Sequence, residues 1–171
     1  MKQYITLTAC LLGWAFFGHG QNVHWGITGG FASANLSTKQ DNTTETTTNS
    51  GFYAGGFAYF EVNSGFGVHS ELLLAGIEDA NAILIPILAE FKLTDQLSLS
   101  TGPQFNFSLE EIPDGFTGLS FGAASGIGFD ISYDLRLKAR YAYQFSNSFT
   151  GDDDIKVRTH FWTIGLGYRF L

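Results

Sequence analysis

The segment Val157–Leu171 reads VRTHFWTIGLGYRFL, and its alternating pattern decides the fold. Apolar or aromatic residues take every second position, and small or polar residues fall between them. Successive side chains of a β-strand point to opposite faces, so this segment has one apolar face and one small or polar face. A soluble sheet would bury the apolar face in its core, whereas an outer-membrane barrel would turn it toward lipid. The residues of this face are Trp162, Ile164, Leu166, Tyr168 and Phe170.

The segment Leu135–Phe149 favours the membrane alternative. It begins LRLKARYAYQF, in which Arg136, Lys138 and Arg140 share the face opposite the leucine and tyrosine side chains. A cation facing lipid costs about 2–4 kcal/mol near the middle of the bilayer, so these three cations belong in the lumen. Buried charges persist only when they are paired, and we expect carboxylates beside them, with the individual pairs left open because the register is unknown. The predicted lumen charge network consists of Glu71, Glu90, Lys92, Arg136, Lys138 and Arg140.

The connections between strand-like segments are of two kinds. NSG, TDQ and SYD are turns of three residues, whereas Ser37–Ser50, Glu110–Thr117 and Thr150–Lys156 are longer, polar and expected to be exposed loops. An up-and-down outer-membrane barrel has short periplasmic turns at one end and longer extracellular loops at the other. The sequence therefore predicts an all-β fold, an eight-stranded antiparallel up-and-down transmembrane β-barrel. The predicted strands are His24–Leu36, Gly51–Val62, Phe66–Ala75, Ala82–Leu93, Leu97–Leu109, Gly118–Ile131, Leu135–Phe149 and Val157–Leu171.

The first twenty residues have the anatomy of a secretory signal peptide. Lys2 precedes the uncharged apolar run Tyr4–Phe17, and Gly20 provides the small residue before a cleavage site. The apolar run is too short for a comfortable transmembrane helix. We therefore expect a signal peptide at residues 1–20 and an outer-membrane β-barrel domain at residues 21–171.

Composition narrows the classes of function further. The chain of 171 residues is long enough for one domain, and its 21 glycines, 17 phenylalanines and 3 prolines favour short strands and tight turns. A net charge of −7 argues against nucleic acid as a partner. The single cysteine, Cys10, lies in the apolar run of the expected signal peptide. A lipidated Cys10 is the weaker alternative, because apolar residues follow it where a polar tether is expected.

The residues that could carry chemistry are few. Asp152, Asp153 and Asp154 form an acidic run, which is more typical of a solvated loop than of a calcium site. We expect no metal and no other cofactor. His160 with a neighbouring serine or threonine could serve a lipid-modifying enzyme, but a lone histidine near a strand end is more often a hydrogen-bonded filler. The sequence therefore predicts no catalysis.

Several stretches resemble one known family. GITGGFASANLS, IPILAEFKLTDQLSLSTGPQF, FGAASGIGFDIS and the terminal GLGYRF are similar to the PorT-type outer-membrane β-barrel proteins of Bacteroidetes. The resemblance implies an eight-stranded barrel in the outer membrane, and it implies that the stripe from Trp162 to Phe170 is a C-terminal signal read by the barrel-assembly machinery. Leu171 departs from the family, in which an aromatic residue usually ends the chain.

These observations predict a small protein of the cell outer membrane with a structural or interaction role. An eight-stranded barrel is just wide enough for side chains to fill its interior, so we expect a packed, charge-paired lumen and exposed polar loops, not a solute channel. The expected partners are outer-membrane lipid, the barrel-assembly machinery and an unidentified protein at the extracellular loops. The alternatives are a lipid-modifying outer-membrane enzyme and a component of a protein secretion apparatus.

Overall fold

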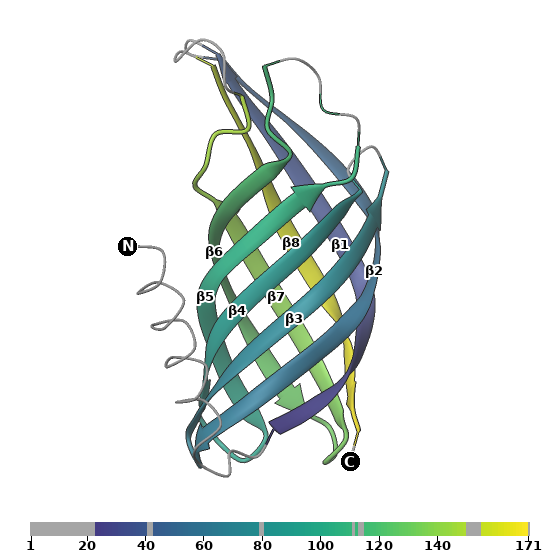
Figure 1. Cartoon of the computed structure of the whole chain (residues 1–171), viewed down its shortest axis with the longest axis vertical. Coiled ribbons are helices and arrows are strands. Elements are labelled where there is room, and N and C mark those ends of the chain that lie inside the picture. The colour runs from purple at the N-terminus through teal and green to yellow at the C-terminus, as the bar shows by residue number, and fades with distance from the viewer. Residues whose placement is uncertain are drawn as a thin grey trace, which may run out of the picture.

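The protein folds into a closed antiparallel barrel of eight strands, in which each strand pairs with its neighbours in sequence and β8 closes on β1 (Figure 1). The computed structural model describes residues 23–40, 43–78, 81–110, 112, 115–149 and 155–170. The predicted signal peptide and the acidic run Asp152–Asp154 lie outside these residues. The predicted fold class is confirmed. The strands are β1 (Val23–Gln40), β2 (Thr43–Asn63), β3 (Phe66–Ile77), β4 (Ala82–Lys92), β5 (Leu97–Ser108), β6 (Leu119–Asp130), β7 (Leu135–Gln144) and β8 (Ile155–Arg169).

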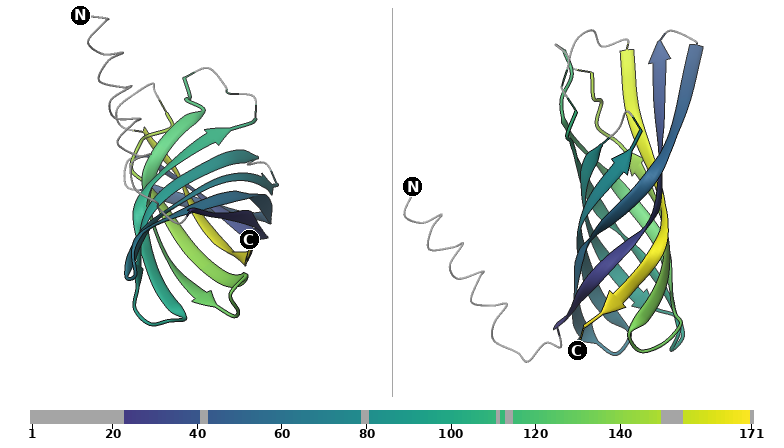
Figure 2. Two further views of the ribbon diagram at one scale, coloured as in Figure 1. Left: turned by 60° about the horizontal axis from the view of Figure 1, so that its bottom comes forward. Right: turned by 90° about the vertical axis from the view of Figure 1, so that its right-hand side faces the viewer.

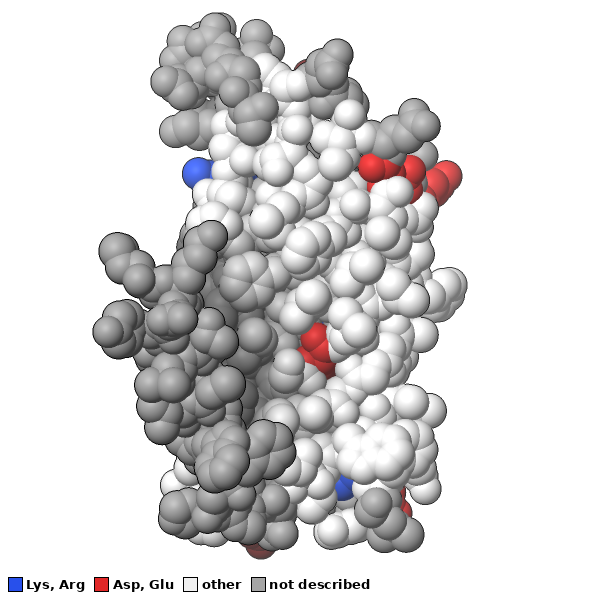
Figure 3. All heavy atoms as spheres, in the orientation of Figure 1, with Lys and Arg blue, Asp and Glu red and all other residues white. Residues whose placement is uncertain are grey.

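The alternation of side chains places an apolar belt on the outside of the barrel. Trp162, Ile164, Leu166 and Tyr168 of β8 are all exposed, whereas Thr163, between two of them, is buried in the lumen. Exposed phenylalanine, leucine and isoleucine side chains continue the belt around the other strands. The face drawn in Figure 3 carries few charged atoms between its two ends, apart from one small acidic spot. An apolar surface of this extent marks a membrane-facing side.

Strand length separates the membrane-crossing part of the barrel from an outward extension. The strands β3 to β7 contain 10 to 12 residues. With a rise of about 3.3 Å per residue and a tilt of about 40°, twelve residues cross about 30 Å, which is enough to span the apolar band of about 25 Å in such barrels. The strands β1, β2 and β8 contain 18, 21 and 15 residues. They project beyond the others at the end away from the C-terminus (Figure 2, right).

Two predicted boundaries differ from the structure by more than two residues, and the predicted loop Thr150–Lys156 also ends early, because β8 begins at Ile155. The threonine-rich segment Ser37–Ser50 was expected to be a loop, but β1 continues to Gln40 and β2 resumes at Thr43, with these two residues paired. Threonine is β-branched and suits a strand, so a polar, threonine-rich hairpin can extend beyond the bilayer. The predicted seventh strand ends at Gln144 instead of Phe149. Beyond Gln144, the N–H groups of two consecutive residues donate to the same carbonyl, that of Phe121, and the chain leaves the ladder.

Barrel closure depends on small residues where β1 meets β8. Gly30 of β1 pairs with Gly165 of β8. A Cβ atom on Gly30 would lie 2.2 Å from the carbonyl oxygen of Ile164, and one on Gly165 would lie 2.3 Å from that of Gly29. Any side chain at either position would therefore force the two backbones apart. These two positions need glycine for close approach of the strands, not for an unusual backbone conformation.

Candidate functional site

The lumen contains a compact cluster of charged side chains that spans the barrel. Glu71 of β3 accepts hydrogen bonds from Nζ of Lys138 (2.5 Å) and Nη1 of Arg140 (2.8 Å), both on β7. In a ring of eight strands β3 and β7 lie opposite each other, so these bonds cross the lumen. Glu71 is only 3% exposed, and a buried carboxylate needs such partners because water cannot solvate it.

A second group of charges continues the cluster toward the three short turns. Arg136 donates from Nη1 to Glu90 (2.6 Å), and its Nε and Nη2 donate to the two carboxylate oxygens of Asp130 (2.6 and 2.8 Å). His69 links the two groups, with Nε2 lying 3.0 Å from Glu71 and Nδ1 lying 3.2 Å from Glu90. Three carboxylates (Glu71, Glu90 and Asp130) therefore meet three permanent cations (Arg136, Lys138 and Arg140).

The structure brings five of the six predicted lumen charges together, and Lys92 lies apart. Nζ of Lys92 is 3.2 Å from Oε1 of Glu61, in a partly exposed pair at the turn end of the barrel. Lys92 belongs to the rim at the short turns because it is the last residue of β4. Sequence reasoning left His69 and Asp130 out of the network. The signal that could have found them is the same alternation, since both share a strand face with predicted lumen residues.

The charged cluster fills the lumen at its level. Between its members the described residues leave cavities of about 10 and 20 Å³, each with room for about one water molecule. A cavity of about 460 Å³ opens on the turn side of the cluster, where Asp130 and Arg136 line it. Lys138 also lies over the ring of Phe57, 5.2 Å from its centroid, so an aromatic side chain fills part of the cross-section beside the ion pairs. This layer has no room for a solute path.

An apolar layer, which was not predicted, lies on the outward side of the charges. Leu73 of β3 follows Glu71 on the same face, and Leu84 of β4 is likewise fully buried. Above them the lumen becomes polar again: Nε2 of Gln104 donates to Asn106 (2.8 Å), and Nδ2 of Asn106 donates to Ser120 (3.2 Å). The alternation in Leu135–Phe149 and Val157–Leu171 identified the lumen faces of β7 and β8. The layers depend on how the eight strands are staggered, which the sequence does not reveal.

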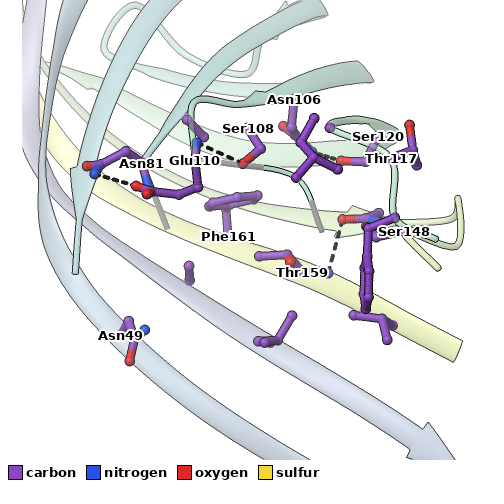
Figure 4. Close-up of a pocket in the computed structure, with 18 residues that line it drawn as sticks. Asn49, Asn81, Asn106, Ser108, Glu110, Thr117, Ser120, Ser148, Thr159 and Phe161 are labelled. Carbon is purple, nitrogen blue, oxygen red and sulfur yellow. Dashed lines mark hydrogen bonds between the residues drawn. The ribbon is translucent and has the colours of Figure 1, made fainter. Parts of the chain in front are cut away.

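A cavity of about 370 Å³ opens above this polar chain, at the outward mouth of the barrel. Figure 4 shows the ring of Phe161 between the Asn81–Glu110 pair and the side chains of Thr159 and Ser148. Asn81 donates to Glu110 from its backbone nitrogen (3.2 Å) and from Nδ2 (2.6 Å), which ties the start of β4 to the segment after β5. The remaining lining residues are Ala34, Leu36, Asn49, Ala82, Asn106, Ser108, Ile112, Phe116, Thr117, Gly118, Ser120, Gln144 and Val157.

Side chains replace part of the backbone ladder between β7 and β8 beside this cavity. The ladder between the two strands ends at the pair Ala142 and Phe161. Beyond it, Oε1 of Gln144 accepts from the N–H of Thr159 (3.0 Å), and Nδ1 of His160 accepts from the N–H of Gln144 (3.3 Å). The cavity wall on this side is therefore built from side-chain hydrogen bonds.

The predicted C-terminal stripe lies on the outer face of β8. Trp162, Ile164, Leu166 and Tyr168 are exposed. The N–H of Phe170 donates to the carbonyl of Trp25 (2.8 Å), and the two rings lie 4.9 Å apart. The end of the chain is thus fastened to the start of β1, which suits a segment that closes the barrel.

His160, the residue of the enzymatic alternative, lies on the outer face of the barrel among aromatic rings. It stacks on Tyr143 with ring centroids 4.5 Å apart. Its Nδ1 already accepts the N–H of Gln144, so in the neutral ring the proton lies on Nε2. In the described part of the chain, no hydroxyl group forms a hydrogen bond with its ring.

The described residues contain no group of three or more histidine, cysteine, aspartate or glutamate side chains arranged to hold a metal ion. Within the same residues there is no helix long and apolar enough to cross a membrane.

Comparison with known proteins agrees with the geometry. The structure is similar to that of Ail, the attachment invasion locus protein of Yersinia pestis, with 22% identity over 86% of this chain and 98% of that one and a TM-score of 0.52. It is similar to Ail in complex with the heparin analogue sucrose octasulfate, with 20% identity over 86% and 99% of the chains and a TM-score of 0.51. Neisserial surface protein A has 15% identity over 89% and 100% of the chains and a TM-score of 0.49. No curated protein matches the sequence.

The apolar belt and the closed ring of eight strands define a small membrane β-barrel protein, and the similarity to Ail shows the same fold. The chain belongs to the family described as outer membrane protein beta-barrel domain, whose sequence pattern matches residues 7–170. Its location is the outer membrane.

Proposed function

We propose that this protein is a non-conducting outer-membrane barrel with a structural or interaction role, and that its outward end meets other molecules. The observation that carries the proposal is the layer of ion pairs between β3 and β7, beside which there is room for about one water molecule. A lumen filled in this way leaves solutes no route across the membrane. Function then rests on the surfaces of the barrel, among them the polar, threonine-rich extension of β1 and β2.

The outward extension offers a place for a protein partner. Pairing between β2 and β3 ends at Gly51 and Ile77, so within the described chain the stretch from Thr43 to Ser50 pairs with β1 alone. Its other edge presents backbone N–H and C=O groups without a strand beside them. Such an edge can accept an extended segment of another protein by β-strand addition. An unidentified protein at the extracellular loops remains part of the proposal on this ground.

Catalysis is not part of the proposed function. A histidine acting as a general base needs a ring nitrogen with a free lone pair near a nucleophile. His160 uses Nδ1 to accept a backbone N–H and packs against Tyr143, which supports a structural role for this residue.

The finer family assignment and the remaining partners are also proposals. The stretches IPILAEFKLTDQLSLSTGPQF and GLGYRF support a PorT-type protein of Bacteroidetes, and that relationship would favour a place in a secretion apparatus as the alternative role. The outward stripe Trp162–Phe170, joined to Trp25, supports recognition by the barrel-assembly machinery. The apolar belt supports outer-membrane lipid as the surrounding partner.

Single cysteines should report which end of the barrel faces outward. Thr47 is exposed on the outward extension and Ser64 is exposed in a short turn at the other end. A membrane-impermeant maleimide should label Thr47→Cys in intact cells and should label Ser64→Cys only after the outer membrane is disrupted. The unaltered chain is the control, because its single cysteine is Cys10. Equal labelling of both variants in intact cells, or labelling of Ser64→Cys alone, would overturn the proposed orientation.

A further inference from the structure

We propose that the cavity at the outward mouth binds a neutral saccharide, either a free sugar or the end of a glycan chain. Its volume of about 370 Å³ falls within the range of pockets that hold small molecules. The inference rests on the proposed function only in taking this end of the barrel as the outward one, which the labelling of Thr47→Cys tests separately.

The lining offers hydrogen-bond donors that the protein itself does not use. The hydroxyl oxygens of Ser108, Ser120 and Ser148 accept hydrogen bonds from Glu110 N, Asn106 Nδ2 and Gln144 Nε2, respectively. Within the described chain none of these three O–H groups donates to another atom. Each hydroxyl is therefore held in place through its oxygen, and its proton remains available to an acceptor in the cavity.

The lining also offers acceptors and amide groups that suit hydroxyl-rich ligands. The two hydrogen bonds from Asn81 both reach Oε1 of Glu110, which leaves Oε2 to accept a proton from a ligand hydroxyl. Asn49 and Thr159 line the cavity with side chains that make no hydrogen bond within the described residues. A sugar carries many hydroxyl groups that both donate and accept, and this lining matches that combination.

Charge and apolar surface narrow the class of ligand. Glu110 carries the one charge among the described lining residues, so the cavity has no cation to attract an anionic sugar. Apolar side chains cover most of the lining surface, and the polar groups lie between them; the apolar residues are Ala34, Leu36, Ala82, Ile112, Phe116, Val157 and Phe161. A sugar ring has C–H groups on its faces and hydroxyl groups around its edge, so its faces suit the apolar lining and its edge can meet the polar groups. Below, the buried Gln104–Asn106 pair and the ion-pair layer close the lumen, so a bound sugar stays at the mouth.

The test uses the refolded full-length mature barrel in a phosphocholine detergent, because maltoside and glucoside detergents carry sugar head groups. Saturation-transfer NMR with maltose, lactose and diacetylchitobiose should detect binding at about 10 mM, where a site with a Kd of about 1 mM is almost full. Ala34→Phe adds a ring inside the cavity and should weaken binding at least tenfold. Ala54→Phe adds the same ring on the exposed outer face of β2 and should leave binding unchanged.

Ser120→Ala provides a second variant, which removes one O–H group without filling the cavity and should weaken binding several-fold. Heat-dependent migration on a gel checks that each variant is folded. Binding of the free disaccharide alone points to a free sugar, and binding of the same disaccharide conjugated at its reducing end points to a glycan; either supports the proposal. The proposal would be overturned if none of the three sugars binds or if Ala34→Phe binds them as well as the unaltered protein does. It would also be overturned if the cationic sugar glucosamine binds ten times more tightly than the neutral sugars.

Discussion

Replacing Glu71 with alanine should lower the free energy of unfolding by about 3–5 kcal/mol, because removing one partner of a buried ion pair leaves charges without compensation. Lys138 and Arg140 both donate to Glu71, at 2.5 and 2.8 Å, and both would remain inside the barrel. Urea unfolding of the refolded protein in lipid vesicles measures the change, followed by the fluorescence of Trp25 and Trp162.

Glu61→Ala is the matched control for this prediction. Glu61 also pairs with a lysine, Lys92, but the pair lies at the rim beside the short turns and is partly exposed. A surface pair of this kind contributes about 1 kcal/mol or less. If Glu71→Ala lowers the free energy of unfolding by no more than Glu61→Ala does, the buried charged cluster does not stabilise the barrel as proposed.

Replacing Ile164 with arginine should destabilise the barrel by about 2–4 kcal/mol, the second largest effect expected. Ile164 is exposed on the outer face of β8 and pairs with Ala139 at the middle of β7, so the arginine would lie near the middle of the bilayer. The same urea experiment in vesicles measures the loss.

Val62→Arg is the comparison for this substitution. Val62 is also exposed on the outer face but lies one residue before the end of β2, near the turns. An arginine close to the membrane interface costs about 0–1 kcal/mol. If the two substitutions lower the free energy of unfolding by the same amount, the apolar belt does not lie in the hydrocarbon core of the membrane.

The sequence predicted the class of fold because the evidence for it is local. The alternation in β8 and the face shared by Arg136, Lys138 and Arg140 can each be read within one strand. The three short turns and the longer outer connections then predict the up-and-down order of the strands. None of these features requires knowledge of the distance between residues on different strands.

The details that depend on stagger between strands could not be predicted. Glu71 meets Lys138 and Arg140, while Glu90 meets Arg136, because of the register of β3, β4 and β7. If one strand were shifted along its neighbour by two residues, these partners would be exchanged, but each side chain would keep the same face. The apolar layer and the mouth cavity arise in the same way, since each combines residues at one height from many strands. The threonine-rich extension was missed for a different reason, because a polar composition was taken to exclude a strand.

Electrical recording across a planar lipid bilayer tests the central claim most directly, namely that the lumen is filled and the protein acts through its outward end. Purified protein whose folded state has been checked by heat-dependent migration is inserted into the bilayer, and a porin of known conductance serves as the positive control. The ion-pair layer predicts a baseline with no channel steps at moderate voltage. Reproducible steps that increase linearly with voltage would contradict the account, because they require a continuous water path past Glu71 and Arg140.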